Sequence, residues 1–167
     1  MNIQIIEASD GPGIDKVERA VKAVFPSMDF VERWCFWAYR RRGNPCVRVL
    51  MRLGGISSLI NLWVAVDETG AVCGTTGLYT TPQDEHEAAW LSWFCVDPEH
   101  RGQGIGKLLI EFSIEEARAA NKKFLRLYTS DDENEAAAQA LYDKAGLAVV
   151  KVEKSKGCTL FYRELVL

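Results

Sequence analysis

Residues 88–129 contain the pattern that most restricts how this chain can fold. Ala88–Val96 is apolar at nearly every position, as expected of a strand covered on both faces. Apolar side chains then recur at helical spacing over Gly104–Ala120, and Phe124–Thr129 returns to strand character. Because two strands joined through a helix can pair in parallel, this pattern predicts a central parallel pair.

The other segments predict antiparallel strands and further helices around this pair. Leu59–Val66 and Ala71–Thr80 are joined by the hairpin signal Asp67-Glu68-Thr69-Gly70. Gly54-Gly55 is interpreted as a loop. The fold class is mixed α/β (α+β), with a mostly antiparallel sheet of about six to seven strands and about four helices. The remaining strands are expected at Ile3–Ile6, Leu147–Val152 and Thr159–Val166, with helices over Ile14–Val24, Met28–Arg42 (capped by Ser27) and Glu135–Ala145.

Length and composition indicate one globular domain over residues 1–167. The formal net charge of −3 argues against nucleic-acid binding. The run Arg40-Arg41-Arg42 is interpreted as the end of a helix, with an anionic acceptor or partner as the alternative. Five scattered cysteines predict neither a disulfide framework nor a zinc site and favour a reducing cytoplasm. No leader and no membrane span is expected.

A glycine-rich segment, Val96-Asp97-Pro98-Glu99-His100-Arg101-Gly102-Gln103-Gly104-Ile105-Gly106-Lys107, separates the buried strand from the following helix. Such a loop at a helix start suits a phosphate or pyrophosphate, although glycines also occur in tight turns for steric reasons alone. A Walker A loop would need Ser or Thr at Leu108, and a dinucleotide fingerprint would need glycine at Lys107. With both of these loops disfavoured, the remaining interpretation is a phosphate-bearing cofactor of another kind. Coenzyme A fits that description.

The run Val96 to Gly106 resembles the cofactor signature of the GNAT superfamily of acyl-CoA N-acyltransferases. Arg101, Gly104 and Gly106 match its core pattern R/Q-x-x-G-x-G/A. The run from Asn134 to Leu147 is similar to the family segment N-x-x-A-x-x-L-Y-x-x-x-G-F, with Leu147 in place of the usual aromatic residue. The first eighty residues resemble the family only in the order of their elements.

The resemblance implies roles for particular residues of this chain. Tyr142 would protonate the departing thiolate of coenzyme A, with a core packing role as its alternative. Asn134 would contact the cofactor, cap a helix, or do both. Backbone groups near Phe94, Cys95 and Val96 would pair with the pantetheine arm of acetyl-CoA. The cofactor pyrophosphate would be held by amides of the glycine loop, carried over to Arg101, Gly102, Gln103, Gly104, Ile105, Gly106 and Lys107.

The general base is not indicated by the resemblance, because Trp90 stands where several family members have glutamate. Glu87 is our candidate; His86, Glu85 and a bound water chain are alternatives, and each of these side chains can equally be an exposed loop residue. Cys95 as a covalent nucleophile is disfavoured, because a buried cysteine in a central strand is usually inert.

The predicted activity is acetyl transfer from acetyl-CoA to a primary amine by direct attack, without a metal. A small molecule is the first acceptor class, and a peptide or protein amine is the second. The tryptophans hint at an apolar or aromatic acceptor pocket. A non-catalytic acyl-CoA-binding module is the alternative function, and a homodimer is left open.

Overall fold

A computed structural model describes residues 2–8, 13–24, 30–155 and 157–167, with only the backbone described for residues 30–33 and 134. The expected Ser27 cap lies outside these residues. The strands are β1 Gln4–Glu7, β2 Ser58–Val66, β3 Val72–Thr80, β4 Ala88–Val96, β5 Phe124–Ser130, β6 Ala148–Ser155 and β7 Cys158–Val166. The helices are α1 Gly13–Val24, α2 Phe30–Arg40, α3 Pro45–Leu53, α4 Ile105–Ala119 and α5 Ala136–Lys144, with short 3-10 turns η1 Pro98–His100 and η2 Glu133–Glu135.

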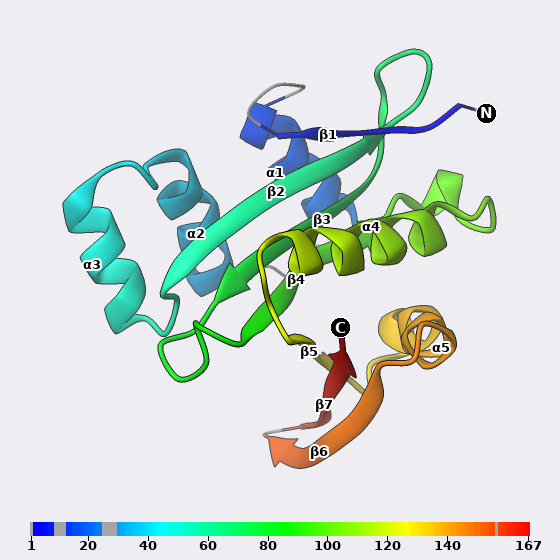
Figure 1. Cartoon of the computed structure of the whole chain (residues 1–167). Coiled ribbons are helices and arrows are strands. Elements are labelled where there is room, and N and C mark those ends of the chain that lie inside the picture. Colours follow the sequence, from blue (N-terminus) through cyan, green and yellow to red (C-terminus); the bar gives the residue numbers. More distant parts are fainter. Residues whose placement is uncertain (1, 9–12, 25–29, 156) are drawn as a thin grey trace.

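The strands form one sheet in the order β1-β2-β3-β4-β5-β7-β6, with β4 at its centre. The predicted parallel pair is confirmed, since Ala88 lies opposite Phe124 and Trp90 opposite Arg126. This pairing ends after Trp90, and the two halves of the sheet diverge beyond it (Figure 1). Every other pair is antiparallel, as expected.

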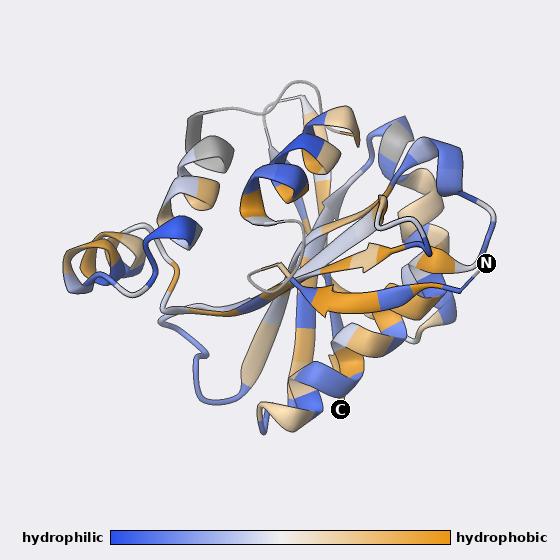
Figure 2. Cartoon of the chain, turned by 90° about the horizontal axis from the view of Figure 1, so that it is seen from above, coloured by the Kyte–Doolittle hydropathy of each residue, from blue (hydrophilic) through white to orange (hydrophobic). Residues whose placement is uncertain are grey.

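Helices cover both faces of the sheet. Val17 of α1 and Phe36 of α2 belong to a buried cluster on one face. Ile110 of α4 and Tyr142 of α5 belong to the cluster on the other face. Figure 2 shows apolar residues along the central strands and hydrophilic residues on the outer loops. None of the helices in the described ranges is long and apolar enough to cross a membrane.

Helix α3 is the main departure from the sequence prediction, and it brings the described α-helices to five. Its N-terminus is capped by Asn44, whose Oδ1 accepts a hydrogen bond of 2.9 Å from Cys46 N, and Pro45 opens the first turn. Val47 and Met51 are its buried residues and pack with Ala38 of α2. The chain after α3 leads through Gly54-Gly55, which is a loop as expected, into β2.

Candidate active site

A β-bulge in β4 shapes the centre of the site. Thr75 lies opposite Cys95 and Gly77 opposite Ser92, so two residues of β4 face the single residue between them on β3. Trp93 within this bulge has φ of 50°, a left-handed conformation that non-glycine residues rarely adopt. Thr75 Oγ1 donates to Trp93 O at 2.5 Å and holds the bulge in place. The bulge bends β4 where its parallel partner no longer pairs with it.

The glycine loop follows β4 directly and leads into α4. Gly102 and Gly104 have φ of 76° and 82°, so both positions favour glycine. Gly104 is the N-cap of α4. Within the described part of the chain, the amides from Gly102 to Lys107 have no hydrogen-bond partner, whereas Leu108 N already donates to Gly104 O. A row of free amides at the positive end of a helix dipole is suited to bind a pyrophosphate.

Gly106 is needed for a different reason, because α4 and α5 approach closely here. A Cβ at this position would lie 3.1 Å from Leu141 Cδ2 and 3.7 Å from Val96 Cγ2. This contact seats the start of α4 against α5 and the end of β4, and so fixes the loop relative to the rest of the site.

A pocket of about 800 Å³ runs from this loop along β4 and α5 toward α2 and the segment after α3. It is within the size range of small-molecule sites. Gln103 does not line it; its Nε2 contacts Glu99 O at 3.4 Å. The side chain of Asn134 lies outside the described residues, while its backbone belongs to η2. The other predicted cofactor residues all line the pocket: Phe94, Cys95, Val96, Arg101, Gly102, Gly104, Ile105, Gly106 and Lys107.

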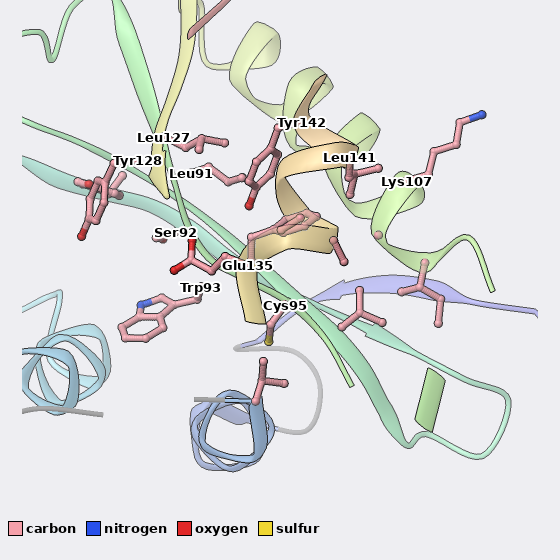
Figure 3. A pocket seen from close by; sticks show the side chains of 18 of the residues that line it. Leu91, Ser92, Trp93, Cys95, Lys107, Leu127, Tyr128, Glu135, Leu141 and Tyr142 are labelled. Atoms are coloured by element: carbon pink, nitrogen blue, oxygen red, sulfur yellow. The ribbon is translucent and has the colours of Figure 1, made fainter. Parts of the chain in front are cut away.

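Tyr142 projects from α5 into the same pocket. The residue is only 6% exposed, and its ring centroid lies 5.6 Å from that of Phe94. Its hydroxyl points into the pocket, on the side where Glu135 and Ser92 lie (Figure 3). Burial raises the pKa of Tyr142 above its ordinary value, and the negative charge of Glu135 acts in the same direction. The phenol is therefore a protonated acid at neutral pH.

Arg163 of β7 supports α5 through several hydrogen bonds. It is 4% exposed; its Nη1 donates to Asp143 Oδ1 at 2.5 Å and to Leu147 O at 2.9 Å, and its Nη2 donates to Gln139 Oε1 at 3.2 Å. These bonds tie β7 to both the middle and the end of the helix that carries Tyr142. The positive charge of Arg163 lowers the pKa of Tyr142, but the increase caused by burial is larger.

Glu135 is a pocket residue that the sequence analysis did not single out. Its carboxylate accepts hydrogen bonds from Thr129 Oγ1, from Ser130 N at 2.9 Å and from Ser130 Oγ at 3.0 Å. These bonds connect the carboxylate, at the start of α5, to the end of β5 and fix its orientation. The only sequence signal was its place beside Asn134 in the second motif.

The structure does not bring Glu87 to the pocket. This residue is exposed and precedes β4, at the end of the strand opposite the glycine loop. The alternatives do not line the pocket either: Glu85 is bound by Arg52 at 2.9 Å, and His86 is exposed. Trp90 Nε1 donates to Asp84 Oδ2 at 2.9 Å, which secures the base of the splayed strands.

Cys95 lines the pocket but is 6% exposed, and its Sγ lies 3.2 Å from Thr75 Oγ1. Burial raises the pKa of the Cys95 thiol to about 11, so the thiolate needed for nucleophilic attack is scarce at neutral pH. The geometry agrees with the packing role expected for this residue.

One group of described residues has ligand atoms close enough to hold a metal ion. Atoms of Asp67, Cys73 and His100 lie within 4.8 Å of one another beside the glycine loop. Each also has a local contact: Asp67 Oδ1 accepts from Ala71 N at 2.9 Å in the β2–β3 turn, Cys73 Sγ donates to Ala71 O at 3.5 Å, and His100 Nδ1 lies 3.3 Å from Asp97 Oδ1. Sequence spacing gave no sign of this grouping, because its members come from separate segments.

Comparison with known proteins places this arrangement in a family. A family model described as the acetyltransferase (GNAT) domain matches residues 58–146, more than half of the chain. The chain therefore belongs to the GNAT acetyltransferase family, and its enzyme class is that of an acetyltransferase. No curated protein sequence matches the chain.

Solved structures share the fold across the whole chain. A GNAT-family protein from Desulfovibrio desulfuricans has a TM-score of 0.73 at 18% identity, covering 99% of each chain. The NatC complex bound to Gag peptide and CoA gives 0.72 at 18% identity, over 100% of this chain and 99% of that one. Salmonella typhimurium yncA, solved with its cofactor acetyl-CoA, has a TM-score of 0.66 at 20% identity, and the match covers 100% of this chain and 95% of that one. The GNAT fold predicted from the sequence is confirmed.

Proposed function

We propose that this protein transfers an acetyl group from acetyl-CoA to a primary amine by direct attack of the amine on the thioester. The observation that carries the proposal is the row of free amides from Gly102 to Lys107, which opens onto a pocket that also contains the Tyr142 hydroxyl. A phosphate-binding cradle and a proton donor thus share one cavity. This combination is what a thioester carried on a nucleotide requires.

The residues of the loop fit the proposed cosubstrate. The amides of the glycine loop would hold the pyrophosphate, and Arg101 adds positive charge beside them. Backbone groups of Phe94, Cys95 and Val96 would pair with the pantetheine arm, because β4 has no strand partner on the β5 side beyond Trp90. Bound acetyl-CoA would supply a thioester that releases a thiol when its acetyl carbonyl is attacked.

Tyr142 is proposed as the general acid. As the new nitrogen–carbon bond forms and the carbon–sulfur bond breaks, its hydroxyl gives a proton to the departing sulfur, and solvent returns one to the phenol. The attacking nitrogen releases its proton to water in the open pocket. Protons and charge balance, so neither a covalent enzyme intermediate nor an external oxidant or reductant is needed.

Tyr142→Phe tests this role through thiol release at saturating acetyl-CoA and a fixed amine. We expect kcat to fall about 10²- to 10⁴-fold, the range typical of a lost general acid, with little change in the Kd for acetyl-CoA. Tyr162→Phe on β7, whose side chain does not line this pocket, is the matched control and should retain full turnover. Equal activity of Tyr142→Phe and wild type would rule out the assignment. Tight acetyl-CoA binding without turnover on any amine would instead favour the non-catalytic module.

We also propose a cytoplasmic location. The five cysteines form no disulfide within the part of the chain that the structure describes, which is compatible with a reducing compartment. Small-molecule amines are the first proposed acceptors and peptide amines the second, a class represented by the peptide-bound NatC neighbour.

A further inference from the structure

The pocket has a second part, beyond Tyr142, that the cofactor residues do not use. We call it the acceptor arm and define it by residues from α2, the segment after α3, β2, β3 and the β4 bulge: Cys35, Tyr39, Ile56, Leu59, Tyr79 and Trp93. It lies across the splayed strands from α5, with Trp93 and Tyr128 at its edge (Figure 3). A ligand in this arm would meet the bound thioester at β4.

The described walls of the acceptor arm are apolar and largely aromatic. Trp93 is held by Phe36, with ring centroids 4.6 Å apart, and Tyr79 packs on Trp90 at 6.4 Å. The Tyr39 hydroxyl is already engaged, since it donates to Asn61 Oδ1 at 3.2 Å. Burial raises the pKa values of Tyr39 and Tyr79, so both phenols are uncharged at neutral pH. These surfaces favour an apolar and aromatic ligand body.

Charge in the described pocket lining is segregated. The basic side chains His100, Arg101 and Lys107 belong to the glycine loop and the first turn of α4, and Lys144 lies at the far end of α5. No described residue that lines the acceptor arm is a cation able to bind a carboxylate or phosphate of the acceptor; Arg42, whose guanidinium lies over the Tyr39 ring at 4.8 Å, is outside the lining. An acceptor with such a group near its amine would have to bury it without a partner, which is costly.

Glu135 supplies the one carboxylate among the described lining residues. No lysine or arginine of the described chain forms an ion pair with it. Among the described residues, its Oε1 accepts a hydrogen bond only from Ser130 Oγ, so this oxygen keeps acceptor capacity toward the pocket. A carboxylate fixed by its neighbours but not neutralised by them is suited to receive a protonated amine.

We propose that the acceptor is a primary amine carried on an uncharged, apolar and preferably aromatic body, with the body in the acceptor arm and the amino group at Glu135. This inference rests on the proposed acetyl transfer and adds the class of acceptor. An arylalkylamine and the amino terminus of a peptide with an aromatic first residue share this chemistry. Glu135 binds and orients the amine as its ammonium form; one proton then passes to water to give the neutral amine that attacks, and Tyr142 remains the proton donor to sulfur.

A matched amine panel tests the acceptor class with the wild-type protein at saturating acetyl-CoA, with thiol release as the readout. We expect kcat/KM for 2-phenylethylamine to exceed that for ethanolamine, spermidine and phenylalanine by at least about tenfold. Phenylalanine has the same ring but carries the disfavoured carboxylate. Tripeptide amides beginning with Phe or Ser separate a peptide source from a free amine. Preference for spermidine, phenylalanine or the Ser peptide would overturn the proposal.

Glu135→Gln tests the amine contact, because the amide oxygen can still accept hydrogen bonds from Ser130. We expect KM for 2-phenylethylamine to rise about tenfold, with an unchanged Kd for acetyl-CoA. Glu133→Gln is the control, since Glu133 is exposed in the same short turn and does not line the pocket. An unchanged amine KM in Glu135→Gln, or a loss confined to cofactor binding, would remove Glu135 from this role.

Ile56→Asp supplies an independent test if Glu135→Gln is poorly folded. A carboxylate in the acceptor arm should lower kcat/KM for 2-phenylethylamine and raise it for spermidine, each by about tenfold, while the acetyl-CoA Kd stays constant. If apolar amines show no advantage in either protein but polar amines are acetylated, the acceptor class is wrong and acetyl transfer stands. If acetyl-CoA does not bind the wild type, the proposed function itself fails.

Discussion

At the scale of single residues, burial determines which pocket side chains can react. Cys95 lies beside the proposed thioester position, but burial keeps its thiol protonated. We therefore predict that Cys95→Ala retains kcat within about threefold and destabilises the fold by roughly 1 kcal/mol through lost packing. Steady-state turnover and thermal unfolding measure the two effects. A loss of more than a hundredfold in kcat, with acetyl-CoA binding intact, would show that the thiol takes part in the transfer.

Individual site residues differ in how far the sequence alone could predict them. Gly102, Gly104 and Tyr142 were predictable because each belongs to a local motif whose spacing fixes its surroundings. Glu87 was chosen for its nearness in sequence to β4. It lies four residues before Leu91, the first β4 residue of the pocket, or about 13 Å along an extended chain. Glu135 is oriented toward the pocket by hydrogen bonds from Thr129 and Ser130, which its place in the motif beside Asn134 did not predict.

At the scale of elements, the β4 bulge links sheet geometry to cofactor binding. Thr75→Val removes the hydrogen bonds to Trp93 O and to Cys95 Sγ, and should cost about 1 kcal/mol of stability. It should also weaken acetyl-CoA binding several-fold, because the pantetheine-facing backbone is no longer fixed. Thr76→Val is the control: its hydroxyl contacts Ser113 Oγ at 2.7 Å, away from the bulge. Calorimetry measures the acetyl-CoA affinity of both variants. Equal affinity would contradict the link between the bulge and cofactor binding.

Element prediction succeeded where the apolar pattern was long and failed where it was short. The β4–α4–β5 crossover has long apolar segments, first of strand and then of helical pattern, and its strand pairing followed from connectivity. Helix α3 was missed because it is short: its apolar residues do lie on one side, opposite Arg48 and Arg52, but its nine residues are too few for that repeat to stand out in the sequence. Asn44 and Pro45 did carry a helix-start signal that could have identified it.

At the scale of the whole molecule, the buried phenols set the response to alkaline pH. Burial raises the pKa values of Tyr39, Tyr79 and Tyr142 above the unfolded value of about 10. The folded state therefore holds more protons than the unfolded state above that pH, and its stability falls there. We predict a constant contribution from these tyrosines below pH 10 and a declining Tm above it. Tyr39→Phe should make the decline shallower in circular dichroism melts, and an identical slope would refute the assignment.

The most direct test of the central claim is calorimetric titration of the wild type with acetyl-CoA, ADP and NAD, repeated with Gly104→Trp. The position has open space and φ of 82°, so an indole there would occupy the phosphate cradle. Gly70→Trp is the matched control, since Gly70 has φ of 79° and open space in the β2–β3 turn, outside the pocket. The account predicts that acetyl-CoA binds the wild type and Gly70→Trp more tightly than ADP or NAD, and does not bind Gly104→Trp. No binding of acetyl-CoA to the wild type, or equal binding to Gly104→Trp, would contradict it.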